Sequence, residues 1–391
     1  MRRMPVHWAI YAPGTVMQAN RIRLAIDARY ASDHFPGIGR VVTALAHAWE
    51  NHPRIGALHI IQNPARQNTY LSLPAESERV LHHFVDGGIG SFHEGQHVRR
   101  LANTLPVDWF YSPYLRLPWG RFRPHTLVTL HDVIPLTVPH TAWVTRLGYA
   151  LAVRMAAARA TCLTTVSQAA ADSIAPFIWP SRTPAIVPNG VDERFFVLPA
   201  RSTTDTEAAH RPYALCVSSN QPHKNLDALV AAWHMLADAS ALGKSATLII
   251  AGHVNPARNQ PWRNTVLPHY PILHVASPSD ERLISLYHNA HMVVQPSLAE
   301  GFGLPILEAL AGGAVVLCHD LPVYHTTAGA AITAIDMQRP ESIAAGMVSL
   351  WQDSARREQQ QHAGPIQARR ADWDAAAERM IDVMQKNTSC R

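Results

Sequence analysis

Short apolar segments alternate with helical patterns along most of the chain, and this alternation limits the possible folds more than any other feature. An apolar strand at 22–27 leads into Pro-Gly-Ile-Gly-Arg (36–40), which we interpret as a glycine loop, and then into apolar residues at helical spacing. Further strands are predicted at 57–61, 109–112, 126–130, 162–166 and 185–188. Strands that alternate with helices form parallel sheets with helices on both faces, so the pattern predicts an α/β fold.

A polar stretch near the middle of the chain divides this pattern in two. Residues 197–211 lack periodicity and are bordered by prolines, which is typical of a linker between domains. After it the alternation restarts, with strands at 213–218, 246–252, 272–276, 292–297 and 314–319 and helices at 225–239, 280–289 and from about 305. We therefore predict two doubly wound parallel-sheet domains, at 21–196 and 212–365, that face each other across a cleft.

The two ends of the chain lie outside these domains in our interpretation. Residues 1–20 contain a histidine and a proline within their apolar part and no convincing cleavage site, so we predict a leader that is not a secretory signal. Residues 366–391 carry a helical repeat of apolar side chains, and no strand follows them. We expect this last helix to pack back across the domain junction.

Cysteine content and hydropathy narrow the cellular setting. The four cysteines form no Cys-x-x-Cys pair, which argues against a disulfide framework and against a cysteine-based zinc site. No apolar run reaches the roughly 18 residues of a membrane-spanning helix. We expect a cytoplasmic protein, with peripheral attachment to the inner face of the cytoplasmic membrane as a further hypothesis.

The strongest motif is Leu-Ala-Glu-Gly-Phe-Gly-Leu-Pro-Ile-Leu-Glu-Ala-Leu, residues 298–310, because it follows a predicted strand and opens a predicted helix. Phosphate oxygens are favoured at the backbone amides of such a helix start. The amides in question belong to Gly301, Phe302, Gly303 and Leu304. The carboxylates of Glu300 and Glu308 suit the hydroxyl pairs of a sugar and a ribose. The alternative is that Glu300 caps the helix and Glu308 is solvated.

With this motif the chain resembles the retaining glycosyltransferases of family 4, and the resemblance extends over residues 22–385. It implies the GT-B fold, in which two Rossmann-like domains face each other. It also implies that Glu300 contacts the donor sugar and Glu308 the nucleotide ribose, while the backbone from Gly301 to Leu304 holds donor sugar and phosphate.

A second motif, residues 218–229, contains one of only three lysines in the chain, against 31 arginines. Lys224 lies at a predicted strand-to-helix turn, where a compact ammonium can neutralise a diphosphate leaving group. An exposed lysine at a helix start is the alternative. Members of the resembling family usually carry arginines where this chain has Ser218 and His223. Lys224 is then the main candidate cation for the diphosphate, with Ser218 as a further donor-binding residue.

Two stretches of the first half add candidate residues. His131 and Asp132 follow a predicted strand, at the edge where open α/β sheets bind ligands. The resemblance implies that His131 contacts the transferred sugar, whereas Asp132 either orients the acceptor or caps a turn. Gly37 and Gly39 permit close approach of a phosphate or an acceptor. Arg40 is a candidate contact for an acceptor phosphate.

Neither a metal nor a separate cofactor is predicted. The pair Asp372 and Asp374 lies at the start of the last amphipathic helix, away from the strand ends, and the 23 histidines show no His-Glu-x-x-His spacing. The Asn-Gly turn at 189–190 follows another predicted strand, and we interpret it as structural.

The basic charge of the chain is confined to its first half. Residues 1–190 carry a net charge of +8 and the remainder −3. Arginines and aromatic residues gather in two neighbouring segments, at Arg116, Trp119, Arg121, Phe122, Arg123, Trp143, Arg146 and Arg154. Such a cluster can dock on anionic lipid, although an ordinary surface loop is the alternative.

The resemblance implies retention of anomeric configuration, and with the features above it predicts a metal-independent glycosyltransferase that moves a hexose from a nucleotide sugar to a lipid-linked or polysaccharide-repeat acceptor. GDP-mannose is the leading donor by family tendency, followed by UDP-sugars. Two other classes remain open. One is another GT-B enzyme, a sugar-nucleotide epimerase or an inverting transferase. The other is a non-catalytic module that binds nucleotide sugar or nucleic acid, although the sequence holds no nucleic-acid motif.

Overall fold

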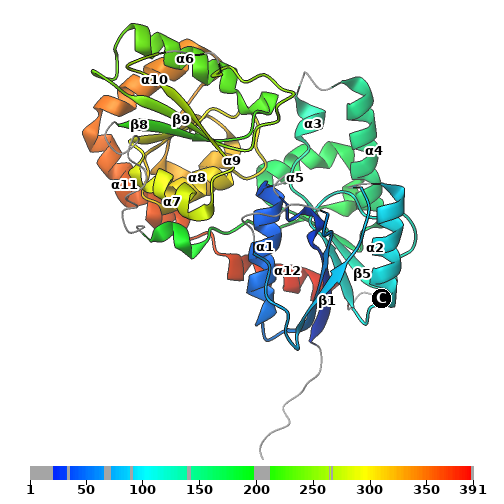
Figure 1. Cartoon of the computed structure of the whole chain (residues 1–391). Helices are drawn as coiled ribbons and strands as arrows, with labels where there is room; N and C mark the ends of the chain where they lie inside the picture. The colour runs from blue at the N-terminus through cyan, green and yellow to red at the C-terminus, as the bar shows by residue number, and fades with distance from the viewer. Residues whose placement is uncertain are drawn as a thin grey trace, which may run out of the picture.

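The chain forms two lobes, each built on a parallel β-sheet (Figure 1). The computed structural model describes residues 21–32, 36–65, 72–88, 91–138, 142–197, 212–263, 265 and 267–388. The predicted leader and all but the first residue of the predicted linker therefore lie outside the described residues.

The first sheet has the strand order β3-β2-β1-β4-β5-β6-β7, and every pairing in it is parallel. Its strands are β1 (Ile22–Asp27), β2 (Ile55–Gln62), β3 (Val80–Phe84), β4 (Trp109–Ser112), β5 (His125–Leu130), β6 (Cys162–Thr165) and β7 (Ala185–Ile186). The sequence pattern did not predict β3. This strand lies at the sheet edge and includes His82 and His83, so only its first residue is fully buried and no apolar run marks it.

The helices of the first lobe are α1 (Pro36–Glu50), α2 (Phe92–Thr104), α3 (Ile134–Thr137), α4 (Trp143–Arg159) and α5 (Gln168–Ile174). The prediction of a glycine loop at 36–40 was wrong, because these residues form the first turns of α1. Pro36 explains the difference. Proline has a fixed φ suited to a helix, and its missing backbone N–H has no partner to lose in a first turn.

The second sheet has the order β10-β9-β8-β11-β12-β13, again with parallel pairings throughout. Its strands are β8 (Tyr213–Val217), β9 (Thr247–Gly252), β10 (Ile272–Ala276), β11 (Met292–Gln295), β12 (Val316–His319) and β13 (Thr333–Ile335). The accompanying helices are α6 (Leu226–Asp238), α7 (Asp280–Asn289), α8 (Leu304–Ala311), α9 (Pro322–Ala328), α10 (Pro340–Gln352) and α11 (Ser354–Ala368). The short strand β13 was not predicted.

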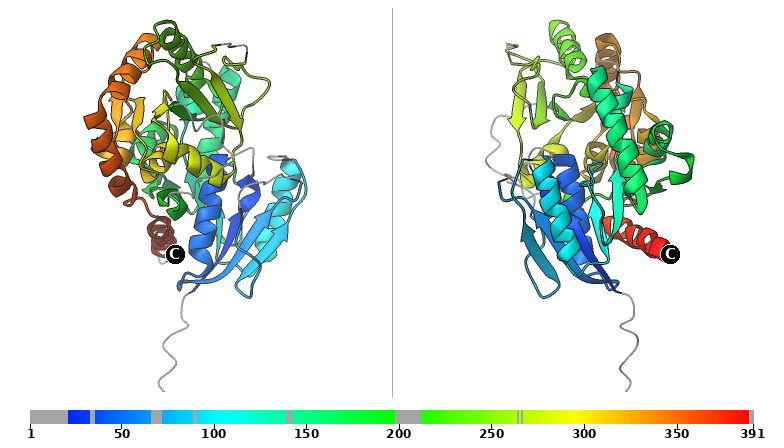
Figure 2. Two further views of the ribbon diagram at one scale, coloured as in Figure 1. Left: turned by 60° about the vertical axis from the view of Figure 1, so that its left-hand side comes forward. Right: turned by 90° about the vertical axis from the view of Figure 1, so that its right-hand side faces the viewer.

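The last helix, α12 (Trp373–Thr388), returns to the first lobe and packs against α1 (Figures 1 and 2). The indole of Trp49 donates a hydrogen bond to the carbonyl oxygen of Ala377 at 3.2 Å. Arg54 forms ion pairs with Glu378 and Asp382 on α12. Within the described residues, the segment that leaves the first lobe and the segment that returns to it contact each other. The Val191 amide donates a hydrogen bond to the Ala371 carbonyl at 3.0 Å.

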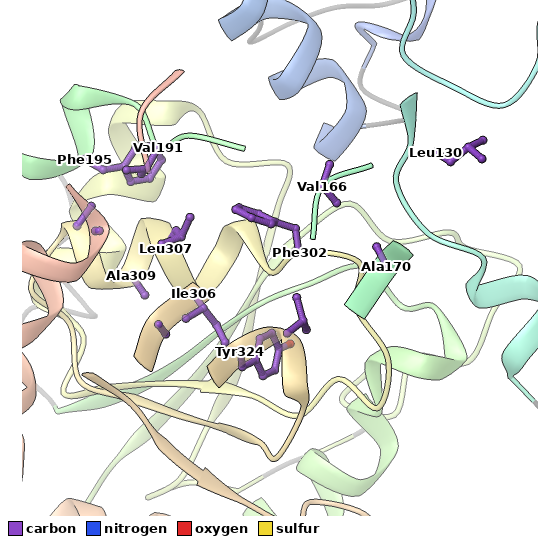
Figure 3. Close-up of a cluster of buried hydrophobic side chains, with 14 of the residues drawn as sticks. Leu130, Val166, Ala170, Val191, Phe195, Phe302, Ile306, Leu307, Ala309 and Tyr324 are labelled. Atoms are coloured by element: carbon purple, nitrogen blue, oxygen red, sulfur yellow. The ribbon is translucent and has the colours of Figure 1, made fainter. Parts of the chain in front are cut away.

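An apolar cluster joins the two lobes near the ends of their sheets. Phe302 and Ile306 of the second lobe belong to the same buried cluster as Leu130, Val166 and Ala170 of the first. Figure 3 shows Phe302 at this boundary, near Val166. Because burial of apolar side chains is favourable, this contact holds the strand ends of the two sheets opposite each other.

Candidate active site

A cavity of about 820 Å³ lies between the two lobes. All but one of the residues that the sequence predicted for the site line it, namely Gly37, Arg40, His131, Asp132, Ser218, Lys224, Glu300, Gly301, Phe302, Gly303, Leu304 and Glu308. Gly39 does not line it. Positions 37, 38, 40 and 41 of α1 line the cavity, whereas position 39 is buried on another side of the helix, because successive helical residues are turned by about 100°.

The proposed phosphate cation and the proposed sugar carboxylate form an ion pair. Lys224 ends a short 3₁₀ turn, Pro222–Lys224, that follows β8, and its Nζ donates to Glu300 Oε1 at 2.6 Å. Burial alone would raise the pKa of Glu300, but the ammonium of Lys224 outweighs it and keeps the pKa below its ordinary value. Glu300 is therefore ionised at neutral pH, and Lys224 keeps two further N–H donors for other groups.

The loop before α8 is shaped by glycines. Gly303 has a φ of +92°, and a Cβ atom there would lie 2.7 Å from the ring of Tyr324, so this position requires glycine. The Leu298 amide donates to the His223 carbonyl at 2.8 Å and ties the loop to the turn that carries Lys224. The start of α8 and the ammonium are thereby held on the same wall of the cavity.

Gly301 brings this loop into direct contact with the first lobe. A Cβ atom at this position would lie 2.3 Å from the backbone oxygen of His131. The hydroxyl of Ser167 caps α5 and also donates to the Gly301 carbonyl at 2.7 Å. The distance between His131 and the loop before α8 is therefore set by backbone contact.

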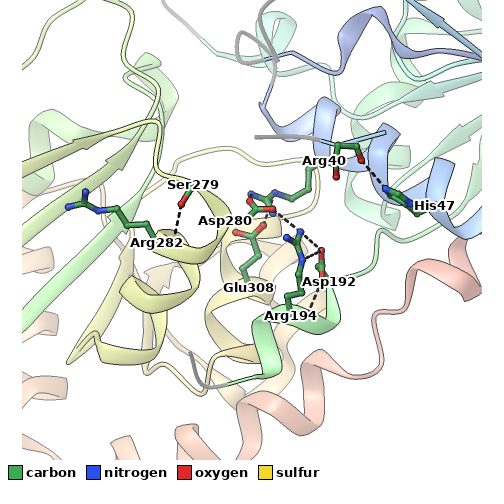
Figure 4. A network of polar contacts seen from close by, with 9 residues as sticks. Arg40, His47, Asp192, Arg194, Ser279, Asp280, Arg282 and Glu308 are labelled. Carbon is green, nitrogen blue, oxygen red and sulfur yellow. Dashed lines mark hydrogen bonds and ion pairs between the residues drawn. The ribbon is translucent and has the colours of Figure 1, made fainter. Parts of the chain in front are cut away.

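Glu308 is buried within a network of polar contacts that crosses the cleft (Figure 4). Arg40 reaches from α1 to Glu308 Oε1 at 3.2 Å and to Asp280 Oδ1 at 3.0 Å. The Tyr287 hydroxyl donates to Glu308 Oε2 at 3.1 Å, and Arg194 also binds Asp280. Burial raises the pKa of Glu308 above its ordinary value, although Arg40 opposes this. Arg40, predicted for an acceptor phosphate, here contacts the two carboxylates of the second lobe.

His131 is neutral in the folded protein. Its Nε2 lies 2.9 Å from the carbonyl oxygen of Pro113, which can only accept, so Nε2 carries the hydrogen and Nδ1 is free to accept. Burial lowers the pKa of His131 to about 4. Asp132 Oδ1 accepts a hydrogen bond from the Ile134 amide at 3.0 Å, the geometry of the capping alternative. Burial raises the pKa of Asp132.

Several lining residues were missed from the sequence, among them Asn189, Asn220, Arg258 and Asp280. Asn189 belongs to the Asn-Gly turn that was interpreted as structural. Its neighbour Gly190 does pack against the backbone of Trp373, yet Asn189 itself lines the cavity. The position of this turn just after a strand was the available signal, whereas nothing in the sequence marked Arg258.

Solved structures with the same arrangement of two lobes are known. Sucrose-phosphate synthase from Thermosynechococcus elongatus has a TM-score of 0.75 at 17% identity, over 95% of this chain and 100% of that one. Anabaena HepE in complex with UDP and glucose has a TM-score of 0.71 at 16% identity, over 93% and 100%. In sequence, residues 204–367 match the family described as glycosyl transferases group 1.

The second lobe belongs to the group 1 glycosyltransferases. The predicted family and the predicted GT-B fold are both confirmed.

The chain matches its curated relatives over only part of their length. The O-antigen chain mannosyltransferase RfbU of Salmonella typhimurium is 26% identical over 202 residues, which are 51% of this chain and 53% of that protein. The O-antigen chain mannosyltransferase B of Escherichia coli is 29% identical over 184 residues, 45% of this chain and 46% of that protein. The chain thus spans about half the length of the curated relatives it matches.

The described part of the chain offers neither a metal-binding cluster nor a membrane-spanning helix. Its His, Cys, Asp and Glu side chains form no group of three or more that could hold a metal ion. Among the same residues, no helix combines the length and the apolar character needed to cross a lipid bilayer.

Proposed function

We propose that this glycosyltransferase transfers a hexose, with mannose as the leading sugar, from a nucleoside diphosphate sugar to a lipid-linked or polysaccharide-repeat acceptor, with retention of configuration and without a metal ion. The supporting observation is that Lys224, Glu300 and Glu308 line one cavity opposite His131. A cation, two carboxylates and a helix start are the groups that a diphosphate, a sugar and a ribose need.

In the proposed reaction the diphosphate lies between Lys224 and the start of α8. As the bond to the sugar breaks, negative charge grows on the leaving phosphate and positive character on the sugar carbon. The ammonium and the backbone amides are fixed before the reaction, so they stabilise that charge without reorganisation. A neutral His131 can contact the sugar without repelling the positive carbon. The acceptor hydroxyl attacks from the face that the diphosphate leaves and gives its proton to the departing phosphate oxygen, and the enclosed cleft limits competing attack by water.

The relatives support mannose as the sugar. RfbU and the E. coli enzyme are named O-antigen chain mannosyltransferases, and three further matches are named serotype-specific mannosyltransferase. We therefore place GDP-mannose first among the donors and a growing surface polysaccharide, or its lipid-linked precursor, first among the acceptors.

An exposed apolar face on α4 supports an acceptor presented at a membrane. Trp143, Leu147 and Leu151 recur at helical spacing, and each is more than half exposed. The helix lies at the edge of the molecule in Figure 1 and contains no acidic residue, while Arg146 and Arg154 are exposed on it. Apolar side chains beside arginines match the interface of an anionic bilayer.

The test of the proposed site is turnover of GDP-, UDP- and dTDP-sugars by the purified protein with Lys224→Met and Glu300→Gln variants. Loss of one fixed group that stabilises transition-state charge lowers kcat by about 10²- to 10³-fold. Lys244→Met and Glu341→Gln change the same residue types at exposed positions away from the cavity and serve as matched controls. Equal turnover by the site variants and their controls would contradict the proposed roles.

Two measurements test the finer parts of the proposal. The anomeric configuration of the product, determined by NMR, separates a retaining enzyme from an inverting one, and an epimerase would yield no transfer product. Co-sedimentation with anionic and with neutral vesicles tests membrane contact. We expect a preference for anionic vesicles that Trp143→Ala weakens, and equal binding to both kinds of vesicle would exclude the α4 surface.

A further inference from the structure

Most of the charges that line the cavity are paired with each other. Its acidic side chains are Asp132, Asp280, Glu300 and Glu308, and its permanently cationic side chains are Arg40, Lys224 and Arg258. Lys224 is bound to Glu300, and Arg40 to Asp280 and Glu308. Within the described residues, Arg258 is the one lining cation that has no carboxylate partner.

The paired cations leave the cavity poorly equipped for a diphosphate. Each phosphate carries a negative charge, and more charge develops as the sugar departs, while every carboxylate in the cavity opposes its entry. His223 does not supply the missing charge, because burial and the neighbouring ammonium of Lys224 lower its pKa to about 4. Ser218 offers only a hydroxyl. An unpaired guanidinium is the group best matched to this deficit.

Hydrogen bonds hold the loop that carries Arg258 against the second lobe. The side-chain amide of Asn220, itself a lining residue, donates to the carbonyls of Asn255 at 2.9 Å and Asn259 at 3.2 Å. The same side chain accepts from the Asn255 amide at 2.8 Å. Asn259 in turn donates to Asp227 on α6 at 2.6 Å. Arg258 thus lies between two positions that are fastened to the second lobe.

The same loop is also held by a buried tryptophan after Asn259, and it forms a tight turn at Arg258. Trp262 is buried in the apolar core of the second lobe. The Arg258 amide donates to the Asn255 carbonyl at 3.1 Å, which closes a tight turn. Its guanidinium is close enough to His223 to contribute to the lowered pKa of that histidine, so the free charge lies near the turn that holds Lys224.

We infer that Arg258 is a second phosphate-binding residue of the donor site, and that it contacts the diphosphate together with Lys224. Asn220 acts as a positioning residue, because it fixes the loop on both sides of the arginine. This inference rests on the proposed function. In that reaction Arg258 stabilises the charge that grows on the leaving diphosphate while Lys224 remains shared with Glu300.

The test is calorimetric titration of the full chain with GDP, UDP and dTDP. A hydrogen bond between charged groups is worth about 1.5–3 kcal/mol, so Arg258→Ala should weaken binding of the preferred diphosphate by about 10- to 100-fold. Arg258→Lys keeps the charge but loses the planar set of N–H donors, so its affinity should lie between those of the unmodified protein and Arg258→Ala. Arg263→Ala is the matched control, since Arg263 is an exposed arginine of the same loop that does not line the cavity.

A salt titration separates a phosphate contact from a purely structural effect. Raising the salt from about 50 to about 500 mM should weaken binding to the unmodified protein more than binding to Arg258→Ala, because the lost contact is electrostatic. Unfolding temperatures of all variants, measured in parallel, should agree.

The possible outcomes distinguish two failures. If the unmodified protein binds none of the three diphosphates, the proposed function fails and the inference with it. If it binds one of them, and Lys224→Met weakens that binding while Arg258→Ala matches Arg263→Ala, the inference alone is wrong. Equal salt dependence of the unmodified protein and Arg258→Ala would also overturn it.

Discussion

Replacing Gly301 by alanine tests whether backbone contact between the lobes sets the reaction geometry. The added Cβ would lie 2.3 Å from the His131 oxygen, whereas real Cβ atoms keep at least 3.0 Å from such neighbours. The lobes must therefore separate locally by about 0.7 Å or more, and the hydrogen bond from Ser167 to the Gly301 carbonyl weakens. Displacement of reacting groups by about 1 Å can cost about 10²-fold in rate. We expect kcat to fall by about 10- to 100-fold.

The assay is steady-state transfer with the preferred donor, together with the unfolding temperature and the affinity for the nucleoside diphosphate. Because the strain arises between the lobes, each lobe should stay folded and kcat should fall more than affinity. Gly95→Ala is the control, since a Cβ atom at that position on α2 would meet Pro118 at an ordinary 3.6 Å. A kcat for Gly301→Ala within about twofold of the control would refute the argument that this contact positions the reacting groups.

Three further changes should alter stability, measured by urea unfolding. Arg40→Met leaves the Glu308 carboxylate without its cation and should lower the free energy of unfolding by about 2 kcal/mol. An unchanged free energy of unfolding would show that this ion pair does not stabilise the protein. Trp373→Ala removes a buried ring that joins α12 to the first lobe and should cost about 3–5 kcal/mol, so a loss below about 1 would contradict that packing. Burial lowers the pKa of His59 to about 4, so the unfolded chain takes up a proton first as the pH falls. His59 should therefore contribute about 1–2 kcal/mol to the loss of stability between pH 7 and pH 5, beside the contributions of His131 and His223, and His59→Gln should remove its own part.

The sequence alone was enough for the fold class and for twelve of the residues that line the cavity. Parallel strands buried on both faces require continuous apolar runs, and such runs mark β4 and β9 clearly. The candidate site residues follow such runs closely, so Lys224 and Glu300 could be placed beside a cleft from their position in the chain. The same reasoning failed for β3, whose edge position leaves it without an apolar pattern.

Only the tertiary structure decided which charges meet. Arg40 and Glu308 are far apart in the chain, and no local pattern indicates that the approach of the two lobes brings their side chains to 3.2 Å. The unpaired state of Arg258 likewise depends on where every carboxylate around the cavity finds its partner. Local propensity and hydrophobic period act over a few residues, whereas electrostatic pairing depends on distances in space, and these are fixed only once the lobes have packed.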